Sequence, residues 1–159
     1  MSAESKSRIV IALTESSPVP ELWRVAMRIM EEAPADVVAL YFEDDKWRRA
    51  ASLPFTCEVS RTGRVTDFSL TRAEEIHREA IERAQRIIAR LAAEANIPSE
   101  FEVLAESDIA LVRKLVGSRN VLVAASHISE RPIYFELNKL NCRILLVESR
   151  EENSSDDQD

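Results

Sequence analysis

Short apolar runs without polar alternation constrain the fold of this chain more than any other feature of its sequence. Such runs are typical of strands buried on both faces, as in a parallel sheet covered by helices on each side. The four runs lie at residues 9–13, 37–42, 121–125 and 144–147, and a weakly alternating segment at 101–105 predicts a further strand. We therefore predict the α/β class, as a three-layer sandwich around a five-stranded parallel sheet with helices on both faces.

The segments between the runs have the spacing of amphipathic helices. Apolar residues recur at helical spacing after Ser17, and Ser16 and Ser17 are expected to cap this first helix. A long helix is predicted over residues 71–95, opened by a capping box of Thr71 and Glu74.

Three further local signals concern the helices. His77 lies among charged residues of the long helix and is expected to be a solvated surface residue. Ser107 or Asp108 can cap a short helix that Gly117 ends. Apolar residues between 133 and 140 predict one more helix before the last strand.

The chain divides into one domain and two short ends. We expect an N-terminal extension at residues 1–7, a domain at 8–148 and a disordered acidic tail at 149–159. Within the domain, residues 46–70 interrupt the alternation of strands and helices, and two alternating segments there predict a β-hairpin or an irregular excursion. Arginines and aromatic residues in this segment fit either a solvated loop packed on the body, which is favoured, or a protein-binding surface.

Composition excludes several classes of protein. The longest apolar run is six residues, against the roughly 20 needed to cross a bilayer, and the first residues have no export signal, so we expect a cytoplasmic protein without membrane contact. Two cysteines and two histidines are too few for a disulfide framework or a structural zinc site, and no metal site is expected.

Charge and glycine content argue against polyanionic ligands. The net charge is -7, and residues 151–159 contribute -5 of it, which leaves -2 on the body. No broad cationic surface for nucleic acid is therefore expected. The two glycines, Gly63 and Gly117, are fewer than phosphate-wrapping loops usually need.

The order of these segments resembles that of the universal stress protein family, an α/β group related to adenine-nucleotide α-hydrolases. The resemblance covers residues 8–148 and rests on the segments 9–16, 121–127 and 141–147 and on the long helix. It implies the strand order 3-2-1-4-5, frequent dimers through the last strand and, in one branch only, ATP at the ends of strands one and four.

The ATP-binding branch has an aspartate at the end of strand one and, after strand four, G-x-x-G, nine residues, and G followed by Ser or Thr. The corresponding positions in this chain hold Thr14, Ala125, Ile128, Asn138 and Lys139, all of which depart from the pattern. The segment after strand four is also shortened, because only three residues separate Asn138 from Cys142. The β-branched Ile128 resists positive φ, and its side chain is expected to occupy the space of the anion.

The candidate residues for a vestigial nucleotide pocket are Thr14, Glu15, Phe42, Ser126 and His127. Glu15 offers a carboxylate beside the position of the missing aspartate. For His127, a structural hydrogen bond is favoured over proton transfer or phosphate contact. No catalytic residue is identified, because Cys142 fits a core position and no G-x-S-x-G motif is present.

The sequence thus predicts a universal-stress-protein-like regulatory or scaffolding module, not an enzyme, that binds no ATP or other cofactor. A homodimer is expected through the last strand, from Ile144 to Val147, and a protein partner is possible. Two alternatives remain open: a nucleotide-binding switch or weak ATPase that uses residues 125–142, and an interaction domain that acts through residues 46–70.

Overall fold

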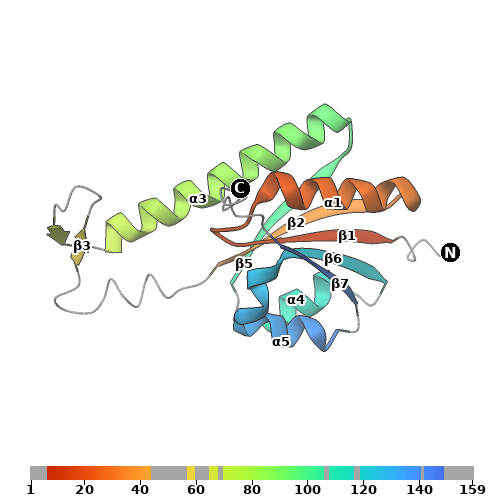
Figure 1. Cartoon of the computed structure of the whole chain (residues 1–159). Helices are drawn as coiled ribbons and strands as arrows, with labels where there is room; N and C mark the ends of the chain where they lie inside the picture. The colour runs from red at the N-terminus through yellow and green to blue at the C-terminus, as the bar shows by residue number, and fades with distance from the viewer. Residues whose placement is uncertain are drawn as a thin grey trace, which may run out of the picture.

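The structure is a computed structural model that describes residues 7–43, 57–59, 65–67, 70–105, 108–116, 119–140 and 142–148 (Figure 1). In chain order the elements are β1 (Arg8–Leu13), α1 (Val19–Glu32), β2 (Asp36–Glu43), β3 (Cys57–Val59), β4 (Val65–Asp67), α3 (Leu70–Ala95), β5 (Ser99–Ala105), α4 (Ile109–Leu115), β6 (Asn120–Ala125), the 3₁₀ helix η2 (Ser126–Glu130), α5 (Pro132–Asn138) and β7 (Arg143–Val147).

Five strands form one parallel sheet in the order β5-β2-β1-β6-β7. Counted along the chain among these five, the order is 3-2-1-4-5, so the predicted fold class and strand order are confirmed. β1 is the central strand, and its Ala12 is in register with Leu40 of β2 and Ala124 of β6. The chain builds outward from β1 to β2 and β5, then returns to add β6 and β7 on the other side. The direction of strand order therefore reverses at β1.

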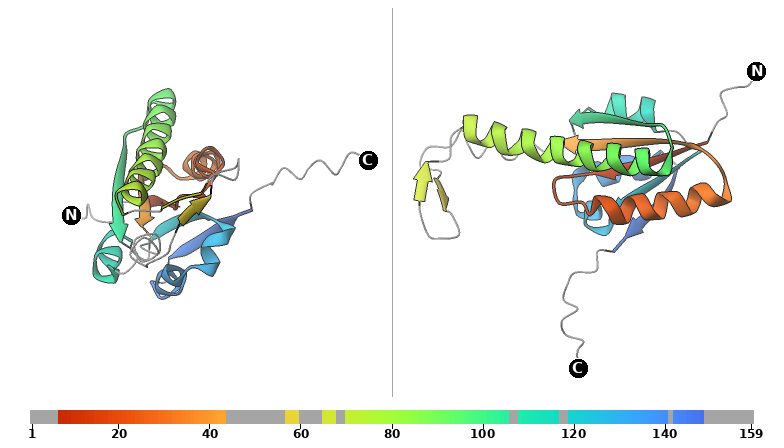
Figure 2. Two further views of the ribbon diagram at one scale, coloured as in Figure 1. Left: turned by 90° about the vertical axis from the view of Figure 1, so that its left-hand side faces the viewer. Right: turned by 90° about the horizontal axis from the view of Figure 1, so that it is seen from above.

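Helices cover both faces of the sheet, as Figure 2 shows. On one face, Ile9, Ile11 and Leu13 of β1 pack in a core with α1 and α3. On the other, Val10 and Ala12 belong to a core with α4, η2 and α5. All five side chains are at most 1% exposed, which is why the β1 sequence is continuously apolar.

The long helix α3 is anchored to the body over only part of its length. Ala84, Ile88 and Ala92 are buried against the first core, whereas Ile76 near the N-terminal end is 41% exposed. Its 26 residues correspond to about 39 Å, and Figure 1 shows its N-terminal part extending beyond the sheet.

Two helix boundaries test the predicted caps. α3 begins at Leu70, so Thr71 has helical geometry and the predicted capping box there is wrong, since an N-cap residue lies outside the helix. Asp108 is confirmed as the cap of α4: its Oδ1 accepts a hydrogen bond from the Leu111 amide at 3.2 Å. Ser107 and Gly117 lie outside the described residues.

The predicted hairpin is present as the antiparallel pair β3 and β4, with Cys57 opposite Asp67 and Val59 opposite Val65. The rest of the 46–70 segment up to residue 69 lies outside the described residues. The same holds for residues 1–6 and for the acidic tail at 149–159, whose predicted disorder stays a prediction.

In the described part of the chain, no helix combines the length and the apolar composition that a bilayer crossing requires.

Replacing Ile88 with alanine should lower the free energy of unfolding by about 2–5 kcal/mol, because it leaves a cavity where α3 packs on the sheet. The same replacement at Ile76, on the same helix, should change it by about 0.5 kcal/mol or less. Urea unfolding followed by circular dichroism measures both values. Equal losses would contradict the anchoring of α3 through its C-terminal part.

Candidate functional site

The carboxyl ends of β1 and β6 lie side by side in the sheet, at the point where strand order reverses. In α/β folds of this kind, ligands bind beyond the carboxyl ends of the strands at such a point. Here the segments that leave the two strands are residues 14–18 and η2. Most of the side chains predicted as a site lie on these two segments.

A hydrogen bond between Thr14 and His127 joins the two segments. Thr14 Oγ1 lies 3.0 Å from Nε2 of His127, and Thr14 is only 3% exposed. Ser16 Oγ lies 3.4 Å from the same nitrogen. The imidazole therefore connects the end of β6 to the turn after β1. Because the Thr14 hydroxyl is buried, this geometry favours a structural hydrogen bond over a nucleophile and base exposed to substrate.

The turn after β1 is closed by Ser17. Its Oγ accepts a hydrogen bond from the Thr14 amide at 2.8 Å and lies 3.2 Å from Thr14 Oγ1. The prediction that Ser16 and Ser17 cap the first helix is wrong, because Pro18 holds the N-cap position and no side chain caps α1. Both hydroxyls instead bond to partners at this turn, on Thr14 and His127.

Glu15 is paired with a residue that the sequence analysis missed. An oxygen of its carboxylate, Oε2, lies 3.6 Å from a guanidinium nitrogen of Arg131, in the turn between η2 and α5. The Arg131 side chain is 13% exposed, whereas that of Glu15 is 51% exposed. No local sequence signal could have found this pair, because the two residues are 116 positions apart.

The other predicted site residues do not join this cluster. Phe42 is fully buried in the core on the α4 and α5 side of the sheet. Ser126 contributes a backbone carbonyl that accepts a hydrogen bond from Ser129 Oγ at 2.9 Å. Ile128 was expected to occupy the space of an anion; this is wrong, because its side chain is 1% exposed within the same core as Phe42.

Two of the solved structures to which this chain is similar are universal stress proteins. A protein of the universal stress protein family from Burkholderia pseudomallei has a TM-score of 0.52 and 19% sequence identity, over 93% of this chain and 100% of that one. The universal stress protein UspA from Lactobacillus plantarum has a TM-score of 0.54 and 14% identity, over 89% of this chain and 97% of that one. The chain has the universal stress protein fold.

The predicted likeness to universal stress proteins is therefore confirmed at the level of the fold. A scan against protein-family models finds no match, and a search of curated proteins finds none either. At these sequence identities the likeness concerns the backbone arrangement and not the side chains of the site.

A second polar cluster lies beside the first, between β2 and α3 of this universal stress protein fold. His77 Nε2 lies 3.1 Å from Oε2 of Glu43, and the His77 side chain is 15% exposed. The predicted solvated position of His77 is therefore wrong. The sequence held a signal for this, since His77 precedes the partly buried Ile81 by four residues and thus lies on the sheet-facing side of α3.

Tyr41 on β2 lies between the two polar clusters. The His77 ring meets it edge-on, with ring centroids 6.3 Å apart. The Tyr41 hydroxyl is buried and has no hydrogen-bond partner among the described residues. Burial raises the pKa of Tyr41 to about 12, with a further contribution from the negative charge of Glu15 that the positive charge of Arg131 opposes.

Cys142 is partly buried beside the second core, and its thiol lies 3.9 Å from the Leu137 carbonyl oxygen. Burial raises the pKa of this thiol, which disfavours the nucleophilic thiolate. In the described ranges, no three His, Cys, Asp or Glu side chains come together as metal ligands would.

The raised pKa of Tyr41 makes stability depend on pH in the alkaline range. The unfolded chain loses the tyrosine proton near pH 10 while the folded chain keeps it to about pH 12, so the free energy of unfolding should fall by about 2–3 kcal/mol as pH rises through this window. Denaturant unfolding of the parent and of Tyr41→Phe between pH 9 and 12 measures the difference. A parent and a variant that lose stability in parallel would contradict the assignment.

Proposed function

We propose that this protein is a cytoplasmic regulatory or scaffolding module of the universal stress protein type that works without bound ATP and without catalysing a reaction. The observation that carries the proposal is the Thr14–His127 hydrogen bond across the ends of β1 and β6. In the ATP-binding branch of the family, the nucleotide is expected at these two strand ends.

The first support is that the polar groups at these strand ends are used internally. The Thr14 amide is bonded to Ser17, its hydroxyl is bonded to His127, and Glu15 is paired with Arg131. A triphosphate would have to displace these interactions before it could make its own. The free energy for that displacement would be subtracted from its affinity.

The second support is the conformation of the segment after β6. Phosphate cradles use successive amides, often with a residue at positive φ. Here the segment is a 3₁₀ helix whose central Ile128 is fixed in the core, and among the described non-glycine residues only Asn96 has a positive φ. α5 then starts with Pro132, which lacks the amide proton that a helix start usually offers an anion.

The third support concerns catalysis. Among the described residues, His127 makes hydrogen bonds through Nε2 only, and no acidic group there orients its other ring nitrogen. Activated nucleophiles usually have a base that is itself oriented by a third group. The arrangement at residues 14–17 and 127 therefore fits a structural link better than an acid-base pair.

Calorimetric titration with ATP and Mg²⁺ tests the proposal. The parent protein should show no saturable binding up to about 1 mM ligand, which corresponds to less than about 4 kcal/mol of binding free energy. Micromolar binding that is lost in His127→Ala would overturn the proposal and favour the nucleotide-switch alternative. Micromolar binding that persists in His127→Ala would overturn it too and would place the nucleotide elsewhere.

We further propose that the module is a homodimer through β7. Among the described residues this strand pairs only with β6, which leaves its other edge without a strand partner there, and Leu146 on it is 39% exposed. An open apolar edge favours pairing with a second strand. The opposite edge strand, β5, has Glu100 and Glu102 exposed, which disfavours pairing there.

Light scattering after size exclusion tests the dimer. The parent should have twice the chain mass of 18.0 kDa, and Leu146→Glu should shift it to the single-chain mass because it places a charge in the interface. Val103→Glu is the matched control, since Val103 lies on β5 and is 40% exposed. The dimer through β7 would be contradicted if the parent protein had the mass of a single chain. It would also be contradicted if Val103→Glu dissociated the dimer and Leu146→Glu did not.

The hairpin offers a second candidate function, as a protein-interaction element. Figure 1 shows β3 and β4 beyond the sheet, beside the N-terminal end of α3. A position outside the two cores leaves this pair available to a protein partner without disturbing the sheet. We retain this alternative beside the dimer, since both concern regulation through protein contacts.

A further inference from the structure

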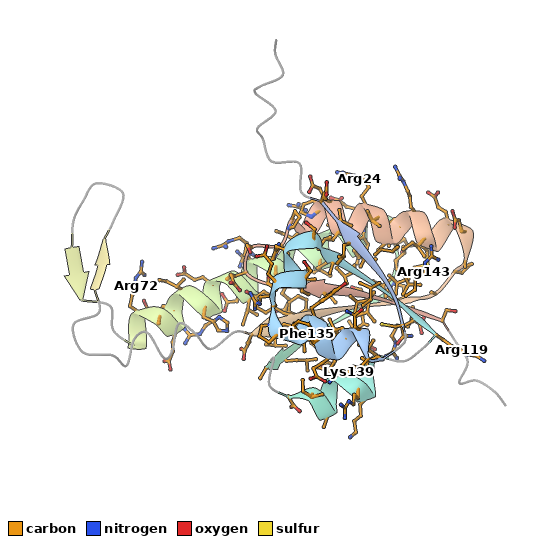
Figure 3. All side chains as sticks on the ribbon, turned by 60° about the horizontal axis from the view of Figure 1, so that its bottom comes forward. Arg24, Arg72, Arg119, Phe135, Lys139 and Arg143 are labelled. Atoms are coloured by element: carbon orange, nitrogen blue, oxygen red, sulfur yellow. The ribbon has the colours of Figure 1, made fainter. Side chains whose placement is uncertain are left out.

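Positively charged side chains gather at the end of the sheet where β6 and β7 begin. α4 ends at this edge with Arg113 and Lys114, and Arg119 immediately precedes β6. Lys139 follows the last residue of α5, and Arg143 is the first residue of β7. All five are exposed, and Figure 3 shows Arg119, Lys139 and Arg143 on this side of the molecule. We call these five residues the amino-end cationic patch.

Little negative charge balances the patch. Glu136 of α5 lies 3.7 Å from a guanidinium nitrogen of Arg113 and 3.6 Å from the Lys139 ammonium. In the part of the chain that the structure describes, Lys114, Arg119 and Arg143 have no carboxylate partner. Because the body as a whole carries a small negative charge, this concentration of cations is local and attracts a negatively charged segment.

The same chain carries such a segment three residues after β7. Residues 151–159 contain Glu151, Glu152, Asp156, Asp157 and Asp159 and no lysine or arginine. We propose that the end of this acidic segment folds back and binds the amino-end cationic patch of its own molecule. The segment would thereby cover this cationic surface and keep other polyanions from it.

Chain geometry decides which of the acidic residues reach the patch. β7 has five residues, so the patch lies about 16 Å back along the strand from its end. The backbone at Glu151 and Glu152 extends at most about 10–13 Å beyond Glu148, which is short of the backbone at the patch. Asp156 extends up to about 26 Å and can reach the patch. The three aspartates therefore carry the interaction, and the two glutamates act as a linker.

Because the acidic segment is tethered to the same molecule, a weak interaction is sufficient for it to occupy the patch. A short flexible linker gives a local concentration on the order of millimolar, so binding requires only a few charge pairs. Such pairs act over about 10 Å at 0.1 M salt and over about 3 Å at 1 M salt. The contact is thus expected to be sensitive to salt.

The test uses the full chain with a nitroxide label at Ser155→Cys, in a background of Cys57→Ser and Cys142→Ala. Paramagnetic broadening should reduce the amide signals of Arg119, Lys139 and Arg143 at low salt, and about 1 M salt should restore them. Asp156→Asn with Asp157→Asn and Asp159→Asn should abolish the broadening, as should Arg119→Gln with Arg143→Gln. Glu151→Gln with Glu152→Gln is the matched control and should leave it unchanged.

Three results would overturn the proposal. The first is equal broadening in the parent and the triple aspartate variant. The second is broadening that also occurs when labelled ¹⁴N protein is mixed with unlabelled ¹⁵N protein, because the contact would then join two molecules. The third is equal affinity of a single-stranded DNA oligonucleotide for the parent protein and for the triple aspartate variant, because the patch of the parent would then be open to nucleic acid.

Discussion

Burial of β1 on both faces is the constraint on which the rest of this structure depends. Its five consecutive apolar residues are almost inaccessible, and alternate side chains belong to two different cores. A strand in this position must be central, so the chain places β2 and β5 on one side and β6 and β7 on the other. Two helical layers follow, because each face of the sheet needs apolar cover.

The same constraint creates the polar site. A central strand that ends beside a neighbouring strand brings the turns after both strands together, and the polar groups there are partly withdrawn from water. The buried Thr14 hydroxyl is stabilised by His127, and the half-exposed Glu15 by Arg131. Tyr41 differs from these groups, since its buried hydroxyl has no hydrogen-bond partner among the described residues. Its burial raises its pKa.

The charged side chains at the two ends of the sheet differ in how they are paired. The carboxyl ends of the strands carry paired groups such as His77 with Glu43, whereas the cations at the amino ends of β6 and β7 mostly lack a carboxylate partner among the described residues. The helices explain the second group, because α4 and α5 both end where the next strand starts. Residues far apart in sequence thus form one charged surface next to the strand that leads into the acidic segment.

The sequence by itself determined the parallel sheet, the positions of its strands and the long helix, and it offered the Asp108 cap and the hairpin at β3 and β4 each as one of two alternatives. Each of these depends on periodicity or capping within a few residues, which a single sequence displays directly. Only the tertiary structure decided the partners of Glu15 and His77, the bonds of Ser17 to Thr14 and the burial of Ile128. These depend on which turn lies against which strand end and on which face of a segment meets the core, and local spacing does not contain that information.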